Sequence, residues 1–241
     1  MIGLGTIINC GAIVMAGLLG HWVGKLFKAD QQESLVKACG VSTLFIAVAG
    51  AMQGMLNIEN GTLVSGKAML VVLCVILGTV IGELLKIEQG FERFGEWLKK
   101  KSGNGGDNRF VDAFVTASFT VCIGAMAIVG SIQDGIQGDY TTLAVKSVLD
   151  FIIVAVMTSS MGKGAAFSAI PVLILQGSVT LLSRLIEPIM TATATAYLSL
   201  IGSVLIFCVG INLVWEKRIR VANALPAVVL AVGAAYLPFS L

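Results

Sequence analysis

Charged residues and histidine are scarce in this sequence, and their scarcity excludes most soluble functions. Asp, Glu, Lys and Arg make up 12% of the 241 residues, against about 25% in a typical soluble domain. A soluble protein needs a polar surface over its core, which a chain with 56% hydrophobic residues cannot provide. The single histidine excludes a histidine-rich metal site, and a net charge of +2 offers no basic surface for nucleic acid. We therefore predict an all-α polytopic membrane protein.

Cysteine patterns and catalytic motifs are also missing. The five cysteines form no CxxC pair and lie in or beside apolar stretches, so we interpret them as small buried hydrophobic residues. Residues 61–68 approach a phosphate-binding loop, but Ala68 stands where that loop needs a metal-binding hydroxyl group. With no HExxH motif and no nucleophile–base pair, we expect no enzymatic activity, no cofactor and no metal.

Long hydrophobic runs dominate the chain instead. A membrane-spanning helix needs about 20 mostly apolar residues, and eight segments qualify, although the last is short and the fifth and sixth are separated only by residues 162–164. We expect one transmembrane domain over residues 1–241, built from hairpins over 3–56, 67–131, 144–184 and 194–240. The expected spans are residues 3–25, 36–56, 67–86, 110–131, 144–161, 165–184, 194–215 and 224–240.

Lysine and arginine residues are distributed unevenly between the loops. Thirteen of them follow the first, third, fifth and seventh spans, and three lie on the opposite side. Because short basic loops stay in the cytoplasm, this asymmetry predicts that both termini lie outside and that the basic loops lie inside.

The longest loop is predicted to contain an amphipathic helix over residues 87–101. Apolar residues recur at spacings of three and four from Ile87 to Leu98, and charged residues occupy the opposite face. Such a helix lies on the cytoplasmic surface or under the bundle. It would be either a connecting helix or the partner surface of a scaffold or sensor.

Two of the expected hairpins share a sequence pattern. Leu, Gly, Gly, Leu and Lys recur at an offset of 58 residues between 19–28 and 77–86, which favours an internal repeat. The repeated pairs, Gly20 with Gly24 and Gly78 with Gly82, are faces through which helices approach closely in lipid. They would pack either within the chain or between subunits, so a homodimer is an open alternative.

Hydrogen-bonding residues are densest over residues 131–150, where Ser131, Gln133 and Asp134 precede Lys146 and Asp150. Lys146 and Asp150 are four residues apart and can pair on one helix face. An ionisable group inside a span is costly and therefore indicates a functional site. Two interpretations stay open: a structural ion pair, or a site that responds to ion or proton binding.

The segment over residues 165–184 carries a proline inside a span. Pro171 lacks a backbone donor and clashes with the preceding turn, so we expect a helix break there. Ser168 could satisfy groups that the break frees, and Gln176 follows on the same helix. Because a broken helix must face protein or water rather than lipid, we add both side chains to the candidate site.

A resemblance supports this choice of region. The motifs that carry it are Gly124-Ala125-Met126, Gly130 to Gly135, Gly138-Asp139, Lys146 to Asp150, Ser168 to Leu173 and Gln176-Gly177. Through them the chain resembles the YqgA/YdfK-type family of bacterial inner-membrane proteins, and the similarity is most specific from Gly124 to Gly177. The resemblance implies a location in the cytoplasmic membrane, and it supplies no catalytic or ligand residues.

We therefore hypothesise a small-solute or ion transporter or channel, with its site between the fourth, fifth and sixth spans. The alternative is a non-transporting scaffold or sensor that uses residues 87–101. The expected partners are membrane lipids and a small solute or ion, with no nucleic acid. The expected lining residues are Ser131, Gln133, Asp134, Lys146, Asp150, Ser168 and Gln176.

Overall fold

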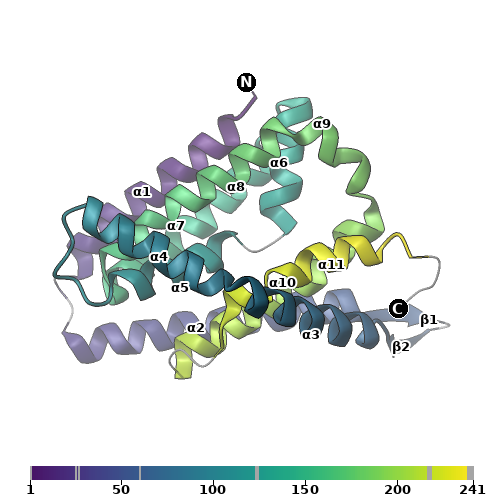
Figure 1. The fold of residues 1–241 in the computed structure, drawn as a ribbon, viewed down its shortest axis with the longest axis horizontal. Coiled ribbons are helices and arrows are strands. Elements are labelled where there is room, and N and C mark those ends of the chain that lie inside the picture. The colour runs from purple at the N-terminus through teal and green to yellow at the C-terminus, as the bar shows by residue number, and fades with distance from the viewer. Residues whose placement is uncertain are drawn as a thin grey trace.

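The computed structural model describes residues 2–24, 26, 28–59, 61–122, 125–215 and 219–237. Over this part of the chain the protein is a helical bundle with one small β-hairpin (Figure 1). The helices are α1 (Leu4–Gly24), α2 (Ala29–Met55), α3 (Ala68–Leu85), α4 (Ile87–Lys101), α5 (Phe110–Cys122), α6 (Ala125–Gln137), α7 (Thr141–Met161), α8 (Ala169–Leu181), α9 (Ser183–Ile186), α10 (Ala192–Trp215) and α11 (Pro226–Ala234). Short 3-10 helices are η1 (Lys163–Ser168), η2 (Glu187–Ile189) and η3 (Val221–Ala224).

Six helices are long and apolar enough to cross a membrane among the residues described: α1, α2, α3, α7, α10 and the continuous pair η1–α8. The expected fourth span, residues 110–131, is instead two helices, because α5 and α6 meet at an angle of 61°. Counting that bent pair as one span gives seven. The expected eighth span, 224–240, corresponds to α11, and the apolar helix Val221–Ala234 that contains it is shorter than a bilayer crossing requires. Residues 238–240 of that expected span lie outside the described residues.

Two local features differ from the sequence interpretation. Helix α2 begins at Ala29 rather than at residue 36, because polar residues continue the helix beyond its apolar part. Strands β1 (Leu56–Glu59) and β2 (Thr62–Ser65) form an antiparallel hairpin that hydropathy did not reveal. Its register pairs Glu59 with Thr62, and the Asn-Gly dipeptide between them is the strongest sequence signal for such a turn.

The helices pack as two groups (Figure 1). Helix α1 contacts α7, η1 and α8, and α5 contacts η1 in the same group. Helix α2 packs along α10, while α3 packs on η3 and α11 in the other group. Two smaller cores lie within the groups, one around Ile13 and Val154 and the other around Leu70 and Ile201. The largest core joins the two groups, since Phe114 packs in one cluster with Leu205.

Glycine allows the closest helix contacts in both groups. A Cβ atom on Gly24 would lie 2.5 Å from the Ser159 carbonyl oxygen, and one on Gly82 would lie 1.9 Å from the Asn223 oxygen. Such distances are too short for any side chain, so the backbones themselves are in contact. The two glycine faces that suggested a repeat therefore pack within the chain rather than at a subunit contact.

Helix α4 occupies the predicted residues, and its apolar face is covered by protein. The Phe91 and Phe119 rings lie 4.8 Å apart, and Phe94 and Phe114 lie 5.9 Å apart. Since Phe91 pairs with the later α5 residue and Phe94 with the earlier one, α4 runs antiparallel to α5. The expected amphipathic helix is thus packed against the bundle.

Candidate functional site

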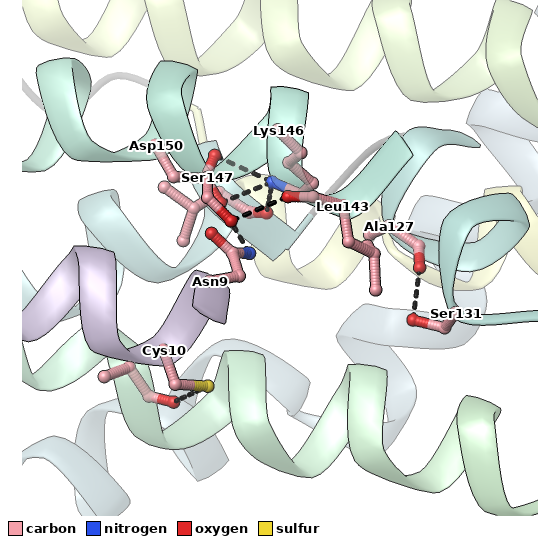
Figure 2. A network of polar contacts seen from close by, with 10 residues as sticks. Asn9, Cys10, Ala127, Ser131, Leu143, Lys146, Ser147 and Asp150 are labelled. Carbon is pink, nitrogen blue, oxygen red and sulfur yellow. Dashed lines mark hydrogen bonds and ion pairs between the residues drawn. The ribbon is translucent and has the colours of Figure 1, made fainter. Parts of the chain in front are cut away.

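Lys146 and Asp150 form a buried ion pair on α7. The Lys146 Nζ atom lies 2.7 Å from Asp150 Oδ1 and 2.6 Å from Oδ2. The two residues are only 7% and 3% exposed. Their spacing of four residues brings both side chains to one face of the helix, as the sequence predicted. Figure 2 shows the pair between α7 and α1.

Groups from two other helices complete this pair. Asn9 on α1 donates from Nδ2 to Asp150 Oδ2 at 3.0 Å. Lys146 also donates to the carbonyl oxygen of Val121 at 2.8 Å. Val121 lies in the last turn of α5, and the carbonyl groups of the last turn form the negative end of the helix dipole. The ammonium group is therefore held by a carboxylate and a helix C-terminus.

Asp134 joins α6 to the beginning of α1. Its Oδ2 atom accepts a hydrogen bond from the Gly5 backbone N–H at 3.0 Å. That N–H belongs to the first turn of α1, where donors have no partner within the helix and the dipole favours negative charge. Asp134 is fully buried, and its other oxygen has no hydrogen-bond partner among the described residues.

Two further predicted residues make contacts of their own on α6. The Ser131 hydroxyl donates to the Ala127 carbonyl of the same helix at 2.6 Å (Figure 2). Gln133 Oε1 accepts a hydrogen bond from the Thr142 hydroxyl at 2.7 Å. The Gln133 contact links α6 to α7, the Ser131 contact lies within α6, and neither brings its side chain to the ion pair.

Ser168 and Gln176 are buried and have no hydrogen-bond partner in the part of the chain that the structure describes. Ser168 is 0% exposed and Gln176 is 1% exposed. Neither the Ser168 hydroxyl nor either polar atom of the Gln176 amide has a hydrogen-bond partner within the described part of the chain. A buried polar group without a partner costs about 1–3 kcal/mol, so these groups are expensive to place here.

Helix α1 is the element that the sequence interpretation left out of the site. Thr6 and Asn9 on α1, Thr158 on α7 and Thr180 on α8 each carry a buried polar atom without a partner in the described residues. Helices α6, α7 and α8 and the 3-10 helix η1 all contact α1. The signal was present in the sequence, because Asn9 is an amide within a long apolar segment.

Pro171 is the third residue of α8 and lies in its first turn. The missing N–H of a proline costs little there, because the first-turn donors have no intrahelical partner. The change from the 3-10 helix η1 to α8 falls between Ser168 and Ala169, just before the proline. Gly162, with φ of +108°, ends α7 on the other side of η1.

A large cavity among the described residues lies elsewhere. It measures about 780 Å³ and is bounded by α4, α5, α8, α10 and α11. Its wall is formed mainly by apolar side chains such as Phe91, Ile174 and Leu198. Pro171 is the one predicted site residue in this wall. The polar residues of the candidate site therefore do not line this cavity.

Charge and metal chemistry add little at the edges of the site. In the connection before α7, hydrogen bonds from the Thr141 side chain and backbone hold the pKa of the exposed Asp139 carboxyl below its ordinary value. No cluster of three His, Cys, Asp or Glu side chains suited to a metal ion occurs in the described ranges.

Comparison with known proteins agrees with the sequence resemblance. The family described as "Protein of unknown function (DUF554)" matches residues 4–236. The uncharacterized membrane protein YdfK of Bacillus subtilis (strain 168) is 24% identical over 94% of this chain and 93% of its own length. The uncharacterized protein YqgA of Escherichia coli (strain K12) is 26% identical over 95% of this chain and 94% of its own. No solved structure matches.

Proposed function

The chain belongs to the DUF554 family and is a membrane protein with several apolar helices, and from that premise we propose that it is a transporter or channel for a small solute or ion. The proposed site surrounds α1, where α6, α7 and α8 meet. It includes Asp134, Lys146, Asp150, Ser168 and Gln176.

The buried polar groups around α1 are the observation that carries this proposal. Burying an ion pair rarely adds stability, because desolvation offsets the Coulombic gain. Atoms on Asn9, Ser168 and Gln176 that have no partner among the described residues add a further cost. Ionisable and polar groups at such depth characteristically mark the pathways of ions and solutes. A passing solute or its water would supply the missing hydrogen bonds.

Interrupted helices beside these groups support the same function. Helices α5 and α6 form a bent pair, and within the span η1–α8 the backbone changes from 3-10 to α-helical between Ser168 and Ala169. In transporters, discontinuous helices place their free backbone groups at the binding site. Here the Val121 carbonyl of the interrupted pair contacts Lys146.

We propose that the protein lies in the cytoplasmic membrane with its N-terminus outside, because the basic loops then lie in the cytoplasm. The C-terminus also lies outside if α11 completes an eighth crossing, and inside if seven segments cross. Local contacts are compatible with this arrangement, since Gly24 lies near Ser159 and Gly164 lies near Phe110. Transport would be passive or driven by a gradient. Membrane lipids are the expected surroundings, and a homodimer is an open alternative.

The test is flux through purified protein in liposomes. Proton, sodium and rubidium movement would be followed with a pH dye and radioactive tracers, and glycerol and urea entry by light scattering. The variant Asp150→Asn should lose the flux that the wild type shows. Glu33→Gln is the matched control, because Glu33 and Lys37 form an exposed pair with the same spacing on α2. Equal flux through wild type and Asp150→Asn, or no flux of any probe, contradicts the proposal.

A scaffold or sensor is the second candidate, and one observation favours it. Several predicted site residues have ordinary pairwise contacts, as in Gln133 with Thr142 and Ser131 with Ala127. Helix α4 would supply the partner surface through its outer face, which includes Arg93, Glu96 and Lys100. Under this function, substitutions on that face would abolish partner binding, and Asp150→Asn would leave it unchanged.

A further inference from the structure

The Lys146 ammonium group is bound as a metal cation would be. Its three neighbours are both carboxylate oxygens of Asp150 and the carbonyl oxygen of Val121, at 2.6 to 2.8 Å. All three ligands are oxygen atoms, which hard monovalent and divalent cations also prefer. Three acceptors also match the three N–H donors of an ammonium group, so Lys146 has no donor left for a solute.

A fourth oxygen lies beside this set. Asn9 uses its Nδ2 atom on Asp150, while its Oδ1 atom is buried and has no partner among the residues described. Asn9 is 0% exposed. Rotation of the amide by half a turn would exchange these two atoms and place Oδ1 beside Asp150 Oδ2, where Nδ2 now lies. The surroundings thus contain one more ligand than the lysine uses.

The helix architecture is the kind that binds cations in transporters. The C-terminal ends of interrupted membrane helices carry free carbonyl groups and a partial negative charge, which coordinate sodium ions or protons. Val121 occupies such a place at the end of α5. The sequence Ser-Val-Leu-x-Phe that begins at Ser147 in α7 recurs in α10, in the other group of helices. In this alignment Lys146 and Asp150 correspond to Gly202 and Ile206. The corresponding positions in α10 therefore lack both the lysine and the aspartate.

We infer that Lys146 fills a monovalent-cation site of this protein with a tethered ammonium group, so that the site needs no alkali ion. This inference rests on the proposed function and deepens it, because it identifies the cation at the proposed site as the Lys146 ammonium group rather than a free ion. It predicts that removal of the lysine side chain converts Asp150, Val121 and Asn9 into a binding site for lithium, sodium or potassium.

The experiment compares wild type with Lys146→Ala in detergent at pH 8. Thermal unfolding is followed in lithium, sodium, potassium and choline chloride at constant ionic strength. We expect one alkali ion to stabilise Lys146→Ala saturably, raising Tm by about 5–10 °C at 100-fold excess over its Kd. Choline should give no such rise, and wild type should respond equally to all four salts. Lys37→Ala is the matched control, because it removes an exposed lysine from a pair with the same spacing.

A double variant shows whether Asp150 is the anionic ligand. Lys146→Ala/Asp150→Asn should fold without ion-specific stabilisation. If Lys146→Ala aggregates in choline but is recovered in one alkali salt, the inference is supported. It is overturned if Lys146→Ala responds equally to all salts, or aggregates in all of them while the double variant folds.

The unfolding test of the cation site can be distinguished from the flux test of the proposed function, because thermal unfolding does not depend on transport. Ion-specific stabilisation of Lys146→Ala without any liposome flux would leave the cation site standing and remove the transporter. Flux that depends on Asp150, together with an ion-indifferent Lys146→Ala, would do the reverse.

Discussion

Two regions of the molecule share one plan but differ in the polarity of their interiors. The first runs from α7 through η1 to α8, and the second runs from α10 through η3 to α11. In each, a long helix is followed by a 3-10 helix and then by a second helix that has a proline in its first turn. Each region also packs against a helix with two closely approaching glycines, α1 for the first and α3 for the second.

Sequence similarity supports this correspondence. Ser147-Val148-Leu149-x-Phe151 matches Ser203-Val204-Leu205-x-Phe207, and Ala169-Ile170-Pro171 resembles Ala224-Leu225-Pro226. The serines even make the same contact, since Ser147 donates to Leu143 and Ser203 to Ser199. The sequence interpretation compared residues 19–28 with 77–86, and it missed this shared pattern.

The difference lies at the corresponding interior positions. Lys146 and Asp150 correspond to Gly202 and Ile206, and Gln176 corresponds to Ala231. The second region has apolar or small residues at these three helix positions, and its buried amide, Asn223, lies in η3 instead. The helix arrangement itself therefore does not require an ion pair or an amide at these positions. The polar groups of the first region therefore call for another explanation, and transport is the one we propose.

The largest expected effect comes from breaking the pair in the first region. Asp150→Leu leaves the Lys146 ammonium buried without its carboxylate, and we expect a loss of about 3–5 kcal/mol in the free energy of unfolding. The double variant Lys146→Met/Asp150→Leu imitates the apolar second region and should recover wild-type stability or exceed it. Unfolding in detergent micelles measures both. A double variant as unstable as the single one would show that the first region does need its charges.

The second effect concerns the glycine contacts that both regions share. Gly82→Ala places a Cβ 1.9 Å from the Asn223 oxygen, and Gly20→Ala places one 2.4 Å from the Ala155 oxygen. Both contacts are with backbone, so we expect losses of about 1–3 kcal/mol, larger for Gly82→Ala. Gly233→Ala is the control, since its Cβ would meet nothing described within 4 Å. Comparable losses in all three variants would mean that close approach is not what these glycines provide.

The third effect isolates the buried amide. Gln176→Leu removes two polar atoms that lack partners in the described structure, and it brings the position closer to Ala231. We expect thermal unfolding to show a gain of about 1 kcal/mol, whereas flux in liposomes should fall. Unchanged flux would remove Gln176 from the site.

Local patterns in the sequence predicted the elements that depend on neighbouring residues. Hydrophobic length indicated α1, α3, α7 and α10, and the spacing of Lys146 and Asp150 indicated their pairing. The helix over residues 87–101 followed from its periodicity. Each of these depends on residues within one helix, so the chain itself encodes them locally.

Contacts between distant segments could not be obtained in this way. Asn9 and Asp150 are 141 residues apart, and Gly5 and Asp134 are 129 apart. Nothing in the local sequence of α1 specifies which helix will meet it. The sequence therefore indicated a polar region over 131–176 but not that α1 would lie at its centre, and the break between α5 and α6 was hidden within one apolar run.

The smallest expected effect concerns the N-terminal ends of α7 and α10, where the two regions begin. Asp139 accepts a hydrogen bond from the Thr141 N–H before α7, and the Thr191 hydroxyl accepts one from the Ala194 N–H before α10. The pKa of Asp139 is lowered in the folded protein, so its contribution exists above the ordinary pKa and disappears as the pH falls through the lowered value. Thermal unfolding should therefore show that Asp139→Ala lowers Tm slightly at neutral pH, with a difference from wild type that vanishes in acid.

Thr191→Ala is the matched variant, because a hydroxyl cap does not titrate. We expect it to cost about 0.5–2 kcal/mol, with the same shift in Tm at neutral and acid pH. If the effect of Asp139→Ala were equally independent of pH, the carboxylate charge would contribute nothing to the start of α7. The two regions would then begin with equivalent caps, and their difference would be confined to the interior positions around Lys146, Asp150 and Gln176.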